Sequence, residues 1–178
     1  MSERQERMIR EELIQISEHV IRSFEFSAVQ CWIKTKVTAP PHDYWAASGS
    51  IYSGVSGILV FIYELHRVNP SPRTLEILTK GCNWLEAQLQ NDDSVGSFHT
   101  GNLGSIYVIV KIALFEGNLK RIDNTVNFLK RAKRYSHQKN DFVNGTAGVV
   151  YGLLKVHELI KNDLLLQEVD YYLGRLLS

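Results

Sequence analysis

Apolar residues follow two patterns that alternate along the chain. Three segments are apolar on nearly every side: 58–65, 106–115 and 149–160. A helix without a polar face must be buried on most sides. Three other segments place apolar residues three or four apart, which gives a single apolar stripe: 72–90, 119–136 and 164–177. We therefore predict an all-α chain of repeated α/α hairpins, in which buried inner helices alternate with amphipathic outer helices.

A short motif stands directly before each predicted inner helix. It is a Ser, Thr or Asn followed by Gly-x-x-Gly, and it occurs at 53–57, 100–104 and 144–148. The first glycines are at positions 54, 101 and 145, so the copies are 47 and then 44 residues apart. A period of this length indicates a repeat architecture. Because Ser, Thr and Asn side chains accept hydrogen bonds from the first turn of a helix, Ser53, Thr100 and Asn144 are the predicted N-caps.

The two glycines of each motif lie on one face of the first helical turn and leave it without side chains. That bare face fits close packing of the helix ends. It also fits a ligand site at which free N–H groups and the helix dipole favour negative charge. The two interpretations are compatible. The candidate lining residues are the motif glycines and two of their neighbours: Tyr52, Gly54, Gly57, His99, Gly101, Gly104, Gly145 and Gly148.

The N-terminal part lies outside the repeats. Residues 4–26 carry an apolar stripe and are predicted to form an outer helix. Residues 34–49 contain Pro40-Pro41, which rules out a continuous helix, and we interpret His42 and Asp43 as loop residues. The expected organisation is one domain over 1–178, with an N-terminal helix and loop followed by three repeats: 1–49, 50–96, 97–140 and 141–178.

Composition narrows the expected partners. The chain has 178 residues, 44% of them hydrophobic, and a formal charge of +1, which gives no electrostatic case for nucleic acid or an anionic membrane. The basic cluster 130–134 is expected to be a solvated face of an outer helix. No apolar run reaches the ~18 residues of a membrane span. Cys31 and Cys82 make no disulfide framework, so a cytoplasmic location is the expectation.

The three motif segments resemble the lanthionine synthetase cyclase (LanC-like) family. They are SIYSGVSGILVFIYEL at 50–65, SFHTGNLGSIYVIVKIAL at 97–114 and DFVNGTAGVVYGLLKVHEL at 141–159, and they match that family's first three repeats. The resemblance implies an α/α toroid, of which this chain supplies about half. It also implies a peptide substrate, in which a zinc-activated cysteine thiol adds to dehydroalanine or dehydrobutyrine to give a thioether ring.

The same resemblance places the zinc ligands, two cysteines and a histidine, in later repeats. This sequence contains no Cys-His pair, and we expect no metal or cofactor in this chain. Asp141 matches the acidic position that opens the third repeat and is the single catalytic candidate. The expected function is therefore that of a cyclase-related domain, truncated and inactive alone. A protein chain that completes the toroid, or a second copy, would cover its exposed apolar ends.

Two other functions stay open. A non-catalytic helical-repeat module could bind a peptide or protein on a concave surface, and its first contacts would be Trp45, Tyr52, Phe98 and His99. An α/α-toroid glycoside hydrolase would need paired carboxylates on inner-helix ends, where Asp141 has no evident partner.

Overall fold

The computed structural model describes residues 2–22, 35–37, 44–46, 48–135 and 139–177. The helices are α1 (Glu3–Arg22), α2 (Val55–Val68), α3 (Pro72–Gln90), α4 (Asn102–Glu116), α5 (Leu119–Arg131), α6 (Thr146–Ile160) and α7 (Asp163–Leu177). Two short strands, β1 (Thr35–Val37) and β2 (Tyr44–Ala46), pair antiparallel with Lys36 opposite Trp45. The prediction of an all-α repeat fold is confirmed, with this one strand pair as the exception.

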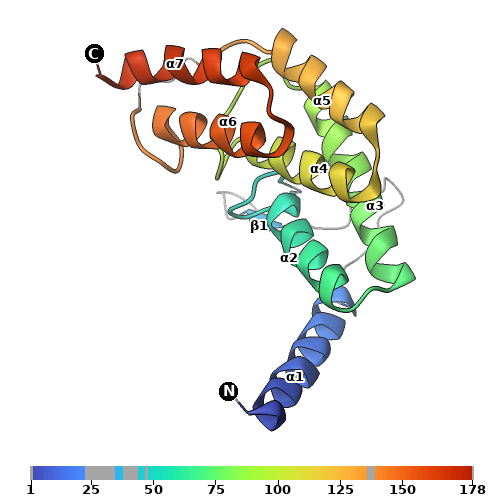
Figure 1. Cartoon of the computed structure of the whole chain (residues 1–178). Helices are drawn as coiled ribbons and strands as arrows, with labels where there is room; N and C mark the ends of the chain where they lie inside the picture. Colours follow the sequence, from blue (N-terminus) through green and yellow to red (C-terminus); the bar gives the residue numbers. More distant parts are fainter. Residues whose placement is uncertain (1, 23–34, 38–43, 47, 136–138, 178) are drawn as a thin grey trace.

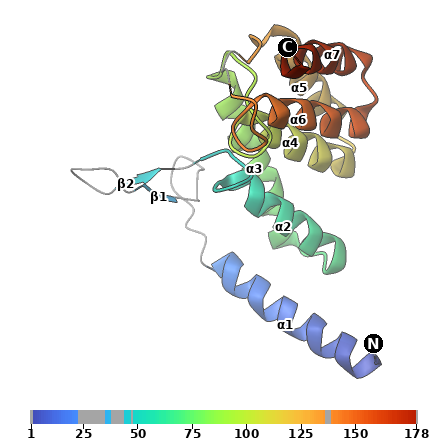
Figure 2. The same cartoon turned by 90° about the vertical axis from the view of Figure 1, so that its left-hand side faces the viewer.

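Helices α2 to α7 form three helical hairpins, α2–α3, α4–α5 and α6–α7, which lie side by side (Figures 1 and 2). Helices α2, α4 and α6 are neighbours in the inner layer, and each packs against the outer helix that follows it. Nine residues of α4 are buried, whereas α5 buries only Arg121, Thr125 and Phe128. The predicted alternation of buried and one-sided helices is therefore confirmed.

The core lies between the two layers. Its largest fully buried aliphatic side chains include Leu59, Ile77, Leu103, Ile109 and Leu153, all less than 3% exposed. They come from four helices of all three hairpins, so one continuous core joins the repeats. Burial of large aliphatic side chains stabilises the array by about 1.5–3 kcal/mol for each of them.

The repeats share one register. An offset of 44 residues carries Gly101 to Gly145, and the same offset carries the C-cap Gly117 to the C-cap Lys161. Both C-caps are left-handed, with φ of 66° and 50°. Since sequence and geometry repeat with one period, residues 44 apart in the second and third hairpins occupy equivalent positions.

The N-terminus of α3 is set by local capping, whereas the C-terminus of α5 is set by tertiary contacts. Ser71 caps α3 in a capping box with Thr74, and Pro72 occupies the first turn. Helix α5 ends at Arg131, five residues before the predicted end near 136. The reason is tertiary: Lys133 donates from its backbone N–H to Asp93 and accepts from Val95, which draws the chain out of the helix.

The N-terminal region differs from the prediction in two respects. Helix α1 forms, but it lies outside the two layers of the hairpins (Figures 1 and 2) and shares with the C-terminal part of α2 only an apolar hollow lined by Leu13 and Leu65. Its stripe residues Ile9, Leu13 and Ile16 are about half exposed. The stretch 34–49, predicted to be irregular, contains the strand pair. Its strands include Thr, Val, Tyr and Trp, which favour extended backbone. His42 and Asp43 lie outside the described residues.

Within the described part of the chain, none of the helices combines the length and the apolar character that crossing a membrane requires.

Candidate functional site

A four-residue turn precedes each inner helix and brings the three motifs to one end of the array. The turns occupy 50–53, 97–100 and 141–144, and each ends directly before the first motif glycine. The N-caps are Gly54, Gly101 and Gly145, which have no side chain to cap the helix. The predicted capping role of Ser53, Thr100 and Asn144 is therefore wrong, because each of them lies one residue before the cap.

Two of the helix starts satisfy an N–H group with a carbonyl oxygen of the segment just before the turn. Val55 donates from its backbone N–H to Ser48 at 2.8 Å, and Thr146 donates to Lys139 at 2.8 Å. A side chain at the second glycine would overlap a carbonyl oxygen of the preceding turn in every repeat. The overlapping pairs are Gly57 with Ile51, Gly104 with Phe98 and Gly148 with Phe142. Close packing is thus the direct reason for the motif glycines.

Two of the side chains predicted as caps, Thr100 and Asn144, join neighbouring turns instead, whereas Ser53 contacts Ser50 of its own turn. The Thr100 hydroxyl lies 2.6 Å from Asn144 Oδ1 and 3.2 Å from the Val143 carbonyl oxygen. Ser97 donates to that same carbonyl at 2.8 Å. These contacts hold the second turn against the third.

Backbone hydrogen bonds continue the connection between turns. Tyr52 donates from its N–H to His99 at 2.9 Å, and Phe98 donates to Gly148 at 3.2 Å. The three turns therefore form one connected surface at the N-terminal ends of the inner helices.

Asp141 is the first residue of the third turn, and its carboxylate accepts hydrogen bonds from the backbone of that turn. Its Oδ1 accepts from the N–H of Val143 at 2.9 Å and from that of Asn144 at 2.6 Å. The equivalent residue of the first turn is Ser50, whose hydroxyl accepts from the N–H of Ser53 at 3.2 Å. A side-chain acceptor therefore starts the first and third turns, whereas Ser97 of the second turn donates to Val143 instead. The Asp141 carboxylate stabilises its own turn.

An aromatic cluster joins the second turn to α4 and α6. Its members are Phe98, His99, Tyr107, Phe142 and Tyr151. His99 is stacked on Tyr151 with ring centroids 6.1 Å apart, and Phe142 lies 4.9 Å from His99. The buried Nδ1 of His99 has no hydrogen-bond partner among the described residues. Phe142 is 48% exposed, so the cluster reaches the surface.

Of the sequence-predicted contact residues, the structure brings Phe98 and His99 into this cluster. Tyr52 lies nearby through its backbone bond to His99, and its side chain is 74% exposed. The Trp45 side chain lies outside the described residues.

A charged ladder continues from the cluster along the inner helices. The repeat register places Glu64, Lys111 and Lys155 at equivalent positions of α2, α4 and α6. Lys111 donates to Glu64 at 2.8 Å, and this hydrogen bond is the main reason that the pKa of the Glu64 carboxyl is lowered. Lys155 pairs with Glu158 on its own helix at 2.6 Å.

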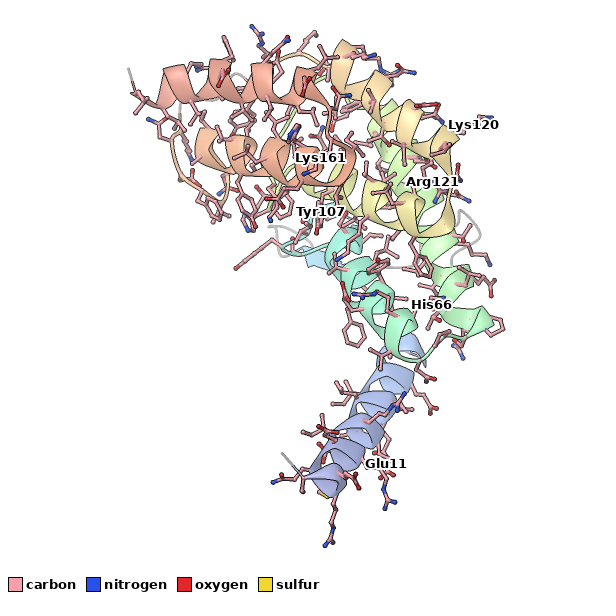
Figure 3. The ribbon with its side chains drawn as sticks, in the orientation of Figure 1. Glu11, His66, Tyr107, Lys120, Arg121 and Lys161 are labelled. Atoms are coloured by element: carbon pink, nitrogen blue, oxygen red, sulfur yellow. The ribbon has the colours of Figure 1, made fainter. Side chains whose placement is uncertain are left out.

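Tyrosines flank the ladder. Lys111 lies 4.8 Å from the ring centroid of Tyr63, and Lys155 lies 5.8 Å from that of Tyr151. Figure 3 places Tyr107 on α4, beside α6 and α2. Sequence reasoning treated these tyrosines as part of the apolar tails and missed that Tyr107 and Tyr151 occupy equivalent positions. The 44-residue register, which also pairs Tyr107 with Tyr151, was the signal that could have found them.

Residues that could hold the zinc of LanC-like cyclases do not come together here. Cys82 is fully buried, and burial raises the pKa of its thiol to about 12, which disfavours the thiolate that zinc requires. The described residues contain no group of three His, Cys, Asp or Glu side chains able to bind a metal. Cys31 lies outside the described residues. The donor set that the structure describes does not fit a zinc ion.

Comparison with known families agrees with the fold and the motifs. The family model described as "Lanthionine synthetase C-like protein" matches residues 46–178, which include all three hairpins and their turns. The comparison with curated proteins finds no match. Since the family match covers most of the chain, including the repeated glycine turns, this chain belongs to the lanthionine synthetase C-like family.

Proposed function

We propose that this chain contributes three hairpins of a lanthionine-forming α/α toroid, and that it closes no thioether ring until a partner chain covers its third hairpin. The proposal has two supports. The first is the open edge of the third hairpin, and the second is the donor set that does not fit zinc.

The open edge is identified by comparing the exposure of side chains at equivalent positions of the inner helices. Tyr63 of α2 packs edge-on against Phe115 of α4, at 5.6 Å between ring centroids. Val110, the equivalent residue of α4, is 0% exposed inside the array. Leu154, the next equivalent residue on α6, is 38% exposed. A position that neighbouring hairpins cover in the middle of the array is thus uncovered at its end.

Helix α7 continues this edge. Leu166, Leu173 and Leu177 are 36%, 39% and 88% exposed. We call Leu154 together with these three leucines the open edge. Apolar surface of this kind typically marks an interface, and a further repeat supplied by a partner would bury it.

The peptide would contact the inner helices. The aromatic cluster offers ring faces to side chains of the peptide, and Lys111 and Lys155 offer cations beside tyrosine rings. Activation of the cysteine thiol by zinc would rest on ligands that the described residues do not supply. This chain would therefore bind and orient the peptide, and the Asp141 carboxylate would keep the third turn in shape.

A non-catalytic module that binds a peptide is the second candidate function. The aromatic cluster favours it, because exposed rings bind extended peptides without any reaction. The two candidates differ in their dependence on dehydroalanine and cysteine in the peptide.

The test uses a synthetic peptide with one cysteine and one dehydroalanine, and a control peptide with serine and alanine in their places. Binding is measured by fluorescence anisotropy, and free thiols are counted by mass spectrometry after alkylation in the presence of zinc. We expect binding without loss of thiol, weakened by Tyr151→Ala and unchanged by Lys120→Ala on the exposed face of α5.

Three outcomes would decide between the candidates. Ring closure by the chain alone would overturn the claim that it is inactive alone. Equal affinity for both peptides would favour the non-catalytic module. No binding of either peptide would exclude both candidates.

A further inference from the structure

The outer layer contains an apolar hollow between α5 and α7, here called the α5–α7 groove. Its volume is about 310 Å³, within the range of ligand pockets. The floor includes core side chains of Leu153, Leu165 and Tyr172, and Val126 and Leu129 of α5 form one wall. The floor is therefore continuous with the hydrophobic core of the array.

The repeat register explains why this gap is apolar. Arg121 of α5 occupies the gap toward α3, where it donates to Asn83 at 2.6 Å and lies 3.4 Å from Glu86. The equivalent residue of α7 is Leu165, which is shorter and uncharged. The hollow between α3 and α5 is lined by polar groups that include Gln90, Asn124, Asn127 and Arg131. The floor of the α5–α7 groove is formed instead by the core side chains of Leu153, Leu165 and Tyr172.

The rim of the groove carries an available cation. Arg134 forms a two-pronged ion pair with Glu168, with both N–O distances at 2.8 Å, and stacks on Tyr171 at 3.9 Å. Lys130 is exposed and has no partner within the described ranges. The rim thus has a net positive charge, and the Lys130 ammonium group can pair with a carboxylate of a ligand.

We propose that the α5–α7 groove binds an amphipathic acidic peptide helix, with its apolar side chains on the groove floor and a carboxylate on Lys130. An apolar slot between two helices is a recurring receptor for the apolar face of a third helix. The charge complementarity selects an acidic helix over a basic one. This surface lies in the outer layer, so it is separate from the inner-helix contacts of the proposed function and would stand if those failed.

The experiment uses two fluorescein-labelled model helices, one with leucines on one face and glutamates on the other, and a twin with lysines for the glutamates. Fluorescence anisotropy with the wild-type chain should show binding of the acidic helix and binding at least about tenfold weaker for the basic twin. Lys130→Glu should weaken the acidic helix by about tenfold as well.

The neighbouring residue provides a matched control. Arg131 is also an exposed cation of α5, but it lines the hollow toward α3. Arg131→Glu changes the net charge by the same amount and should leave the affinity unchanged. A second variant, Ala132→Trp, places a large ring in the groove and should abolish binding while the helical circular dichroism is retained.

Equal effects of Lys130→Glu and Arg131→Glu would overturn the proposal, because they would indicate attraction to net charge alone. Equal affinity for the acidic helix and its basic twin would also overturn it. Binding of laurate, an apolar carboxylate, with no binding of either helix would assign the groove to lipids and overturn the peptide claim.

Discussion

At the scale of single residues, the motif glycines are fixed by the carbonyl oxygen that each of them faces. The sequence identified these glycines and their period correctly, but it misplaced the caps. Ser53, Thr100 and Asn144 are typical capping residues, and only the turn geometry shows that the helix begins after a glycine. The Thr100 hydroxyl contacts Val143 and Asn144 of the next turn, and such long-range partners leave no local sequence signal. Ser53 instead contacts Ser50 of its own turn.

This geometry predicts opposite effects for two glycine-to-alanine substitutions. A methyl group at Gly148 would overlap the Phe142 carbonyl oxygen and stand 3.2 Å from the Ser97 Cβ, whereas nothing lies within 4 Å at Gly174 of α7. Gly148→Ala should destabilise the fold by about 3 kcal/mol and lower Tm by roughly 6–12 °C. Gly174→Ala should stabilise it by about 0.5–1 kcal/mol, since alanine is the better helix former. Thermal unfolding followed by circular dichroism measures both, and a neutral Gly148→Ala would refute the packing account.

At the scale of elements, helix types and most boundaries could be predicted from apolar periodicity. The prediction failed where tertiary contacts overrode it. Helix α5 stops at Arg131 because Lys133 joins Asp93 and Val95, which are close in space but distant in sequence. Helix α1 was predicted correctly as a helix, but its stripe did not reveal that the side chains would be exposed.

Helices α3, α4 and α5 meet at one buried arginine, which Figure 3 labels on α5. The Arg121 side chain is 7% exposed and pairs with Glu86 at 3.4 Å and with Glu116 at 3.5 Å. Burial raises the pKa of the Glu86 carboxyl, and Arg121 opposes that shift. The positive charge of Arg121 therefore balances the negative charges of two partly buried carboxylates, those of Glu86 and Glu116.

Replacement of this arginine by leucine, the residue at the equivalent position of α7, should destabilise the array. Arg121→Leu should cost about 3 kcal/mol at neutral pH, because it leaves buried carboxylates without a counter-charge. Without Arg121 the pKa of folded Glu86 rises further above its unfolded value, so the folded state takes up a proton first. Stability of the variant should therefore increase as pH falls from about 7 to about 5.

Urea unfolding of the wild type and of Arg121→Leu at several pH values measures this difference. The double variant Arg121→Leu/Glu86→Gln should recover part of the loss at neutral pH. A deficit that does not depend on pH would mean that lost packing, and not the uncompensated carboxylates, causes the destabilisation.

At the scale of the whole molecule, the repeat period predicted the hairpin array, and the resemblance of the three motif segments predicted the family; both are confirmed. The candidate site was predictable only in part. The sequence identified His99 beside its motif. The charged ladder, and the equivalent positions of Tyr107 on α4 and Tyr151 on α6, become apparent only when the hairpins are aligned by their period.

The measurement that tests the central claim most directly is sedimentation equilibrium of the purified chain. With the open edge uncovered, the wild type should associate at micromolar concentrations, and Leu154→Glu/Leu173→Glu should be monomeric because the edge would then carry two charges. Leu119→Glu, at a position of α5 that is 71% exposed and away from the edge, should behave as the wild type. A compact monomer at every concentration, or association that the edge substitutions leave unchanged, would contradict the account.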